Sequence, residues 1–155
     1  MSVYRGLLFS VLGLCFCVSC STENDFTDDQ YVRLLSSKIQ IDTNGQKTVQ
    51  LQFEVAEGYH IMTNEVSEDN FITTKLTLSS NEAIQFGIPR FSEAVVHYLE
   101  GVEQPLMVFE GVFSVTLPFR TTAAILPDLE GELYYQACDK GKCFFPRELG
   151  IVCKD

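Results

Sequence analysis

Hydrophobic and polar residues alternate along much of the chain from about residue 35 onward. Larger, mainly apolar residues recur at every second position in the stretches 49–55, 72–78, 109–119 and 133–137. Side chains two positions apart point to the same side of a β-strand, so each set can face one core. Gly111 lies on the apolar side of the longest stretch and suggests a β-bulge there. The pattern predicts an all-β fold.

Turn-forming residues separate the predicted strands. Residues 42–45 read Asp-Thr-Asn-Gly between the first two strands, and Asn-Gly supplies the positive φ angles of a tight hairpin. Further turn signals occur at 57–58, 87–89 and 127–128, and no segment shows an apolar helical stripe with capping residues. Short alternating strands with this spacing predict an antiparallel β-sandwich. A body of about 125 residues can bury an adequate core without a disulfide.

The first residues have the layout of a secretory signal. Residues 1–5 carry one positive charge, and residues 6–19 form an apolar run. The run ends at Cys20, and the whole segment resembles a bacterial lipoprotein signal, in which cleavage precedes a cysteine that then carries lipid. Cys17 replaces the leucine that is usual three residues before that cysteine. The alternative is an ordinary cleaved signal with incidental cysteines.

These features predict three parts of the chain. We expect a lipoprotein signal peptide over residues 1–19, a lipidated N-terminus and tether over 20–34, and a sandwich domain over 35–155. The domain would face the periplasm, held by lipid alone on a bacterial membrane, because a 14-residue apolar run is too short to cross a bilayer. The formal net charge is −10, and no lysine or arginine cluster is present. Nucleic acid is therefore excluded as a partner, since phosphate binding needs a basic face.

Two cysteines near the C-terminus are candidates for redox chemistry. Cys138 and Cys143 bracket the polar loop 139–142, and an oxidising compartment allows them to form a disulfide. A loop this small removes little chain entropy, so stabilisation is a weak reason for the pair. The two lysines of the loop favour the attacking thiolate, whereas its aspartate opposes it. Reversible thiol chemistry is the better reason for the pair.

A structural disulfide and a zinc site are the alternatives to redox chemistry. The pair can be a purely structural hairpin disulfide, or the three cysteines Cys138, Cys143 and Cys153 can join a histidine in a zinc site, although the spacing matches no common zinc pattern. Cys153 is expected to be a buried free thiol. The alternative for this residue is exchange with Cys143.

Three segments resemble the N-terminal periplasmic domain of the DsbD family of thiol:disulfide interchange proteins. Residues 134–146 are similar to its active-site segment, which reads Tyr-Gln-x-Cys, a short polar loop, then Cys-aromatic-Pro-Pro. Residues 53–62 look like the family's strand that ends in a Gly-aromatic turn, and residues 108–115 like its YEGEVTIPV-type strand. The resemblance covers about residues 35–152 and implies an immunoglobulin-like sandwich.

The resemblance also implies a protein-disulfide reductase-type activity in an electron relay. The family's domain passes electrons to thioredoxin-like periplasmic proteins, among them disulfide isomerases and proteins of cytochrome c maturation. Cys143 corresponds to the cysteine that forms mixed disulfides, and Cys138 to the one that resolves them. We expect a separate membrane protein as the electron donor, and neither a cofactor nor a metal. The second hypothesis is a non-catalytic binding or chaperone-like sandwich with a structural disulfide.

Further residues are expected around the two cysteines. Tyr98 matches the aromatic cap loop that shields the family's cysteines. His60 and Met62 stand where the best-known members have two tyrosines, and residues 145–146 replace the paired prolines. We expect His60 to pack beside the disulfide, with titration that tunes the thiolate as the alternative, and His97 to lie on the surface. The predicted surround comprises His60, Met62, Tyr98, Tyr135, Gln136 and Phe144.

Overall fold

The computed structural model describes residue 26 and residues 30–41, 43–65, 71–79, 82–98 and 104–154. These ranges contain twelve β-strands, so the all-β prediction is confirmed. Within them, no helix has the length and apolar character needed to cross a membrane. The strands are β1 (Val32–Ile41), β2 (Lys47–Val55), β3 (His60–Met62), β4 (Lys75–Leu78), β5 (Ile84–Phe86), β6 (Arg90–Phe91), β7 (Val95–His97), β8 (Leu106–Phe109), β9 (Val112–Thr121), β10 (Leu129–Tyr135), β11 (Ala137–Cys138) and β12 (Arg147–Cys153).

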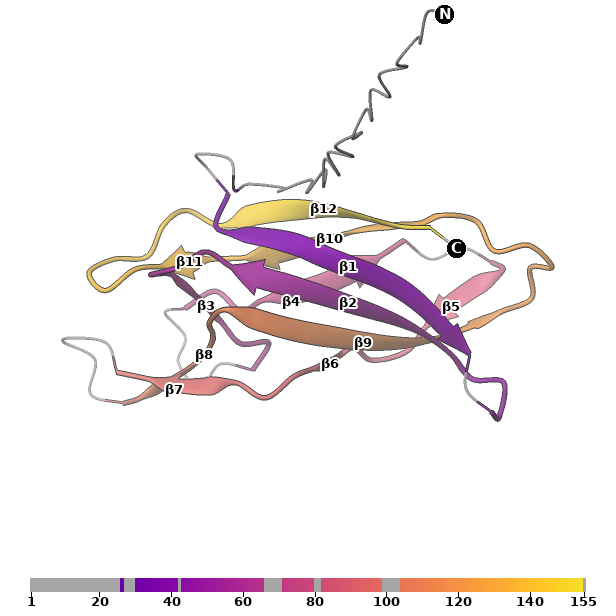
Figure 1. Ribbon diagram of the computed structural model, residues 1–155, viewed down its shortest axis with the longest axis horizontal. Coiled ribbons are helices and arrows are strands. Elements are labelled where there is room, and N and C mark those ends of the chain that lie inside the picture. Colours follow the sequence, from indigo (N-terminus) through magenta and orange to yellow (C-terminus); the bar gives the residue numbers. More distant parts are fainter. Residues whose placement is uncertain are drawn as a thin grey trace, which may run out of the picture.

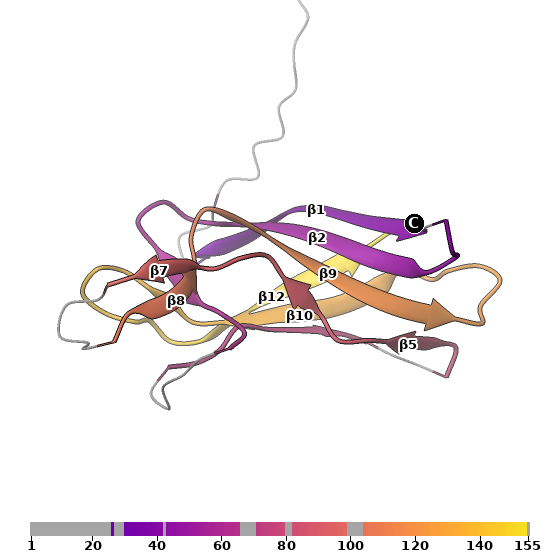
Figure 2. The ribbon, with the colours of Figure 1, turned by 90° about the horizontal axis from the view of Figure 1, so that it is seen from below.

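The strands form three antiparallel sheets. One has the order β1-β2-β9-β5, with β6 also paired to β9, the second has the order β12-β10-β4, and the third β11-β3-β8-β7. Figures 1 and 2 show β1, β2 and β9 as one layer, with β10 and β12 in the other. The third sheet lies at one end of the sandwich, at the left in Figure 1. The predicted antiparallel sandwich is confirmed.

The first hairpin follows the sequence pattern closely. Strands β1 and β2 pair from Val32 opposite Val55 to Ile41 opposite Lys47, and Gly45 in the turn has a φ of 80°. The first strand begins at Val32, ahead of the expected domain start at residue 35. Val32 is fully buried, which anchors the beginning of β1 in the core.

The stretch 109–119 is not a single strand, so this part of the prediction is wrong. Strand β8 ends at Phe109 and β9 begins at Val112, and Gly111 between them has a φ of 57°. The chain changes sheets at this point, because β8 pairs with β3 and β7 whereas β9 pairs with β2 and β5. The predicted strand at 72–78 is also shorter than expected and is limited to β4.

The core lies between the two layers and is rich in aromatic rings. On β2, the apolar positions Val49, Leu51, Phe53 and Val55 are at most 2% exposed, as the alternation predicts. Phe113 stacks on Phe53 with centroids 5.2 Å apart and on Phe109 at 4.7 Å. These contacts continue the core across the sheet change, toward the end of the sandwich that holds β11.

Candidate redox site

A disulfide joins Cys138 to Cys143 at the end of the sandwich. Cys138 lies on β11, where it pairs with His60 on β3, and it forms an isolated bridge to Cys143 across the loop. Cys138 is fully buried, whereas Cys143 is partly exposed. Of the two cysteines, Cys143 is therefore the one that solvent can reach.

The loop between the cysteines is closed by hydrogen bonds of its own. The N–H of Asp139 donates to the Lys142 carbonyl at 2.9 Å. The Asp139 side-chain oxygen Oδ1 accepts from the N–H groups of Gly141 at 2.7 Å and Lys142 at 2.8 Å. These two donors hold the pKa of Asp139 below its usual value, so the exposed carboxylate stays ionised. Backbone and side-chain hydrogen bonds therefore hold this turn together with the disulfide.

Gln136 fixes the loop to the rest of the domain. It separates β10 from β11, and its Nε2 donates to the Phe144 carbonyl at 2.9 Å, while its Oε1 accepts from the N–H of Ile72 at 3.4 Å. On the backbone, the N–H of Phe144 donates to the Ala137 carbonyl at 2.8 Å. The Gln136 side chain therefore links the segment that holds the two cysteines to the segment before β4.

Three aromatic rings gather beside the disulfide loop. Phe144 lies 4.9 Å from Tyr31 and 5.9 Å from Tyr59 between centroids, and the two tyrosines are 4.7 Å apart. The Lys142 ammonium lies 4.9 Å from the Phe144 centroid and the Arg147 guanidinium 5.5 Å from that of Tyr31. Sequence reasoning predicted Phe144 in the surround but missed both tyrosines. Tyr31 was assigned to the tether, although its position just before a buried valine was a usable signal.

Two histidines and a glutamate meet next to Cys138. The His60 and His97 rings lie 4.1 Å apart between centroids, and His97 Nδ1 is 2.8 Å from Glu110 Oε1. His60 is 2% exposed, and burial, followed by the neighbouring His97, lowers its pKa, which keeps the imidazole neutral. His97, which we expected on the surface, has a side chain that is only 24% exposed. The contact with His60 explains this burial.

The other predicted surround residues differ in their surroundings, and the phenol of Tyr135 hydrogen-bonds with the backbone of Tyr31 in the aromatic group. Met62 is buried with Leu106 and Val108 in a small second cluster, and Tyr135 is buried in the main core, where burial raises the pKa of its phenol. Tyr98 follows β7 and is 80% exposed, with no ring contact to any residue in the described ranges. Its role as a cap stays a prediction.

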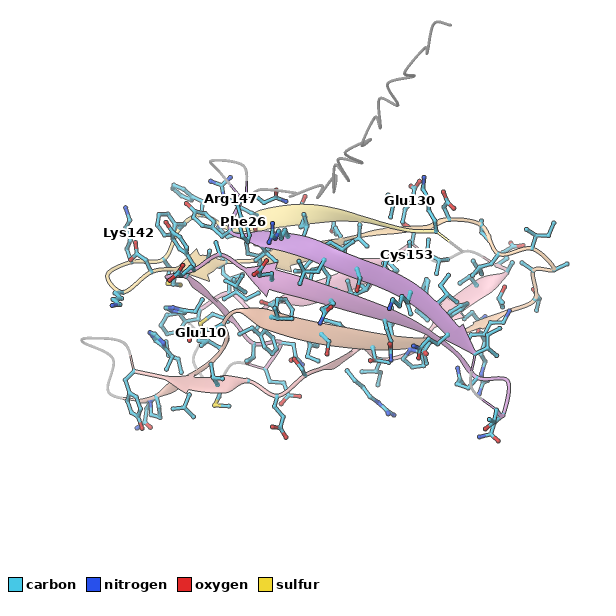
Figure 3. The ribbon with its side chains drawn as sticks, viewed as in Figure 1. Phe26, Glu110, Glu130, Lys142, Arg147 and Cys153 are labelled. Carbon is cyan, nitrogen blue, oxygen red and sulfur yellow. A yellow bond between two sulfur atoms is a disulfide. The ribbon has the colours of Figure 1, made fainter. Side chains whose placement is uncertain are left out.

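Cys153 is a free, fully buried thiol, and burial raises its pKa. On β12 it pairs with Leu129, whereas Arg147 pairs with Tyr135 at the other end of β10, a span of about 20 Å at ~3.4 Å per residue. Figure 3 shows Cys153 and Lys142 toward opposite ends of the sandwich. The exchange with Cys143 and the three-cysteine zinc site are therefore both wrong.

The sequence of the sandwich matches one protein family over almost its whole length. Residues 32–151 match the family described as the N-terminal part of the thiol:disulfide interchange protein DsbD. The chain belongs to the DsbD N-terminal domain family. No curated protein matches the chain in sequence.

Solved structures show the same fold at low identity. The N-terminal domain of Neisseria meningitidis DsbD in the reduced form is 17% identical, with a TM-score of 0.50 over 77% of this chain and 83% of that chain. The N-terminal periplasmic domain of ScsB from Proteus mirabilis is 12% identical, with a TM-score of 0.54 over 83% of this chain and 48% of that chain. A complex of the DsbD and PilB N-terminal domains from N. meningitidis is 15% identical, with a TM-score of 0.46 over 75% and 79%. The first of these structures identifies the antiparallel sandwich as the immunoglobulin-like fold of DsbD N-terminal domains.

Proposed function

We propose that the chain carries out thiol:disulfide exchange in the periplasm, relaying electrons to or from thioredoxin-like partners through a reversible Cys138–Cys143 disulfide. Family membership and the disulfide-bonded pair support this proposal. The observation that carries it is the unequal exposure of the two cysteines, with Cys143 partly exposed and Cys138 buried. A partner's sulfur can then react with Cys143, while Cys138 stays buried until it resolves the mixed disulfide.

The exchange consists of two sulfur-for-sulfur displacements. In the reduced chain, the Cys143 thiolate attacks one sulfur of the partner's disulfide, which forms a mixed disulfide and releases one partner thiolate. The Cys138 thiolate then attacks the Cys143 sulfur, which closes the internal disulfide and releases the second partner thiolate. Two electrons pass from the chain to the partner, and the dithiol of an electron donor restores the reduced pair by the reverse steps.

Charges around the loop adjust the reactivity of Cys143. Lys142 precedes it in the chain, and a nearby ammonium group favours the thiolate. The ionised Asp139 carboxylate opposes the thiolate, although it also holds the turn through its two N–H donors. Asp139 thus stabilises the turn and, through its charge, disfavours the Cys143 thiolate.

A trapping experiment tests the proposal. In a full chain with Cys15, Cys17 and Cys20 replaced by serine, Cys138→Ala leaves the attacking cysteine without its resolving partner. We expect this variant to accumulate a mixed disulfide with oxidised thioredoxin-like periplasmic proteins on non-reducing gels. The matched Cys143→Ala variant should form none, because its two remaining cysteines, Cys138 and Cys153, are both buried. Absence of adducts in both variants, or equal adducts in both, would refute the proposed roles.

We also propose the arrangement that places the domain in the periplasm, with a signal over residues 1–19, lipid on Cys20 and a tether after it. Residues 1–25, which include the signal and Cys20, lie outside the described part of the chain. The support is the apolar run followed by cysteine in the sequence. Metabolic labelling with a radioactive fatty acid should mark the wild-type chain and not a Cys20→Ser variant. Equal labelling, or none in either chain, would contradict the anchor without touching the exchange chemistry.

A further inference from the structure

His60, His97 and Glu110 form a group of potential metal ligands. One potential ligand atom from each of the three residues lies within 4.8 Å of the other two. The three side chains also line a pocket of about 470 Å³ that reaches Lys140 of the disulfide loop. The group therefore borders open space, and two of its members, His97 and Glu110, are partly exposed.

His60 carries the observation that points to a missing ligand. Its side chain is buried, and its Nε2 atom has no hydrogen-bond partner among the described residues. A buried polar atom without a partner costs free energy, and native proteins satisfy nearly all such atoms. In the tautomer with its proton on Nδ1, the Nε2 lone pair of this imidazole is available to a group that protein atoms do not supply.

We propose that His60, His97 and Glu110 bind a divalent transition-metal ion of the zinc class. Two imidazole nitrogens and one carboxylate oxygen, with water in the fourth position, form a donor set that Zn²⁺ accepts. Ligand atoms around a tetrahedral zinc lie about 3.3 Å apart at Zn–N and Zn–O distances near ~2.05 Å. The observed range, from 2.8 Å between His97 and Glu110 to an upper limit of 4.8 Å, brackets that value.

Binding of the ion requires a small shift of the ligand side chains, and the two that must shift are partly exposed. The His97 and Glu110 side chains are 24% and 44% exposed, so both can shift by the small amount needed while His60 stays fixed on β3. The ion would replace the hydrogen bond between them, with Nδ1 of His97 giving up its proton or the ring offering its other nitrogen. The charge of Glu54 in the same pocket is paired with Arg33 at 2.6 Å, so Glu57 and Glu110 against the ammonium of Lys140 leave the lining with a net negative charge.

The site is separate from the thiol chemistry proposed above, because none of its three ligands is a cysteine. His60 nevertheless pairs with Cys138 in the β3–β11 ladder, so the ion would lie close to the disulfide. The oxidised chain is the form in which to test binding, since its disulfide cysteines cannot act as ligands. Failure of metal binding would leave the exchange proposal standing.

The test uses the full chain with Cys15, Cys17 and Cys20 replaced by serine, oxidised and freed of metal by a chelator. Titration calorimetry with Zn²⁺ should give one site per chain, and Co²⁺ should give the visible absorption of a four-coordinate ion. His97→Gln and Glu110→Gln should each weaken Zn²⁺ binding by about tenfold or more. Both residues are partly exposed, so these variants are expected to fold, which circular dichroism checks. Glu57→Gln removes a carboxylate that lines the same pocket but is not a proposed ligand, so it should weaken Zn²⁺ binding far less than Glu110→Gln does.

Three results would overturn the proposal. The first is the absence of Zn²⁺ binding to the oxidised chain, which would leave a hydrogen-bonded cluster only. The second is binding that Glu57→Gln weakens as much as Glu110→Gln does, which would mean attraction of cations to an acidic surface. A His60→Gln variant that folds should also lose the site, and unaltered affinity in that variant would contradict the assigned ligand set.

Discussion

Reducing the Cys138–Cys143 disulfide is expected to lower the free energy of unfolding by only about 2 kcal/mol. The two cysteines are separated by five positions in sequence. Chain-entropy estimates for closing so short a loop give about 2 kcal/mol, against roughly 4–5 kcal/mol for a loop of about 100 residues. The bridge is therefore a minor contributor to the stability of a domain whose core lies between other strands.

The structure supplies the reason that the reduced loop keeps its shape. The bonds from Asp139 N–H to the Lys142 carbonyl and from Phe144 N–H to the Ala137 carbonyl do not involve sulfur. The Asp139 carboxylate adds two more, from backbone N–H groups within the loop. We therefore expect opening of the disulfide to leave the hairpin in place, ready to close again.

Stability and reduction potential are linked by a thermodynamic cycle. The difference in unfolding free energy between the oxidised and reduced chains equals the free-energy difference between reducing the folded and the unfolded disulfide. For a two-electron couple, about 30 mV corresponds to ~1.4 kcal/mol, so about 2 kcal/mol corresponds to roughly 45 mV. Folding thus lowers the potential only slightly and leaves the bond reducible.

Urea unfolding of the oxidised and reduced chains, followed by far-ultraviolet circular dichroism, measures this difference. The Cys138→Ala/Cys143→Ala double variant is the control, because it cannot reoxidise and should match the reduced chain. A difference above about 4 kcal/mol, or an unfolded reduced chain at neutral pH, would refute the reasoning and indicate a structural bridge.

Three further predictions concern packing, charge and burial. A Cβ atom at Gly131 would lie 2.2 Å from a backbone oxygen of β4, so Gly131→Ala should cost about 1–3 kcal/mol of unfolding free energy in urea. Gly150→Ala, in the same sheet with nothing within 4 Å, should change it by about 0.5 kcal/mol or less, and equal effects would contradict the packing argument. Asp139→Asn keeps the oxygen that accepts the turn's hydrogen bonds but removes the negative charge that disfavours the Cys143 thiolate. Iodoacetamide should therefore alkylate reduced Cys143 about two- to threefold faster near neutral pH, and slower alkylation would contradict this effect of the charge. Burial raises the pKa of Cys153, so peptide-level mass spectrometry should find it unmodified in the native chain and modified in urea, and native labelling at the rate of Cys143 would disprove its isolation.

The fold was predictable where alternation and turn chemistry agreed. The hairpin of β1 and β2 follows from an Asn-Gly turn placed just before the alternating stretch 49–55, and the structure has that hairpin with Gly45 at positive φ. The stretch through Gly111 was misread because the apolar period continues across the sheet change. Phe109 and Phe113 stack on each other from different sheets, so the sequence pattern alone does not reveal the break.

The site was predictable in sequence-local parts and not in its long-range contacts. The cysteine pair and its loop lie within one short segment, so spacing and family resemblance were enough to find them. Tyr31 joins the site from the start of β1, and His97 joins His60 from a strand far along the chain. Such contacts depend on how strands are arranged in three dimensions, and a single sequence carries no pairing signal for them.

The central claim is that the Cys138–Cys143 disulfide opens and closes as part of the protein's work. Equilibrating the chain in glutathione or dithiothreitol buffers, then alkylating and counting modified cysteines by mass, measures the reduction potential of the pair. We expect a value above about −300 mV, within the range of disulfides that exchange with thioredoxin-like proteins. A potential well below about −300 mV would show that the bridge resists reduction, and the domain would then be a binding module with a structural disulfide.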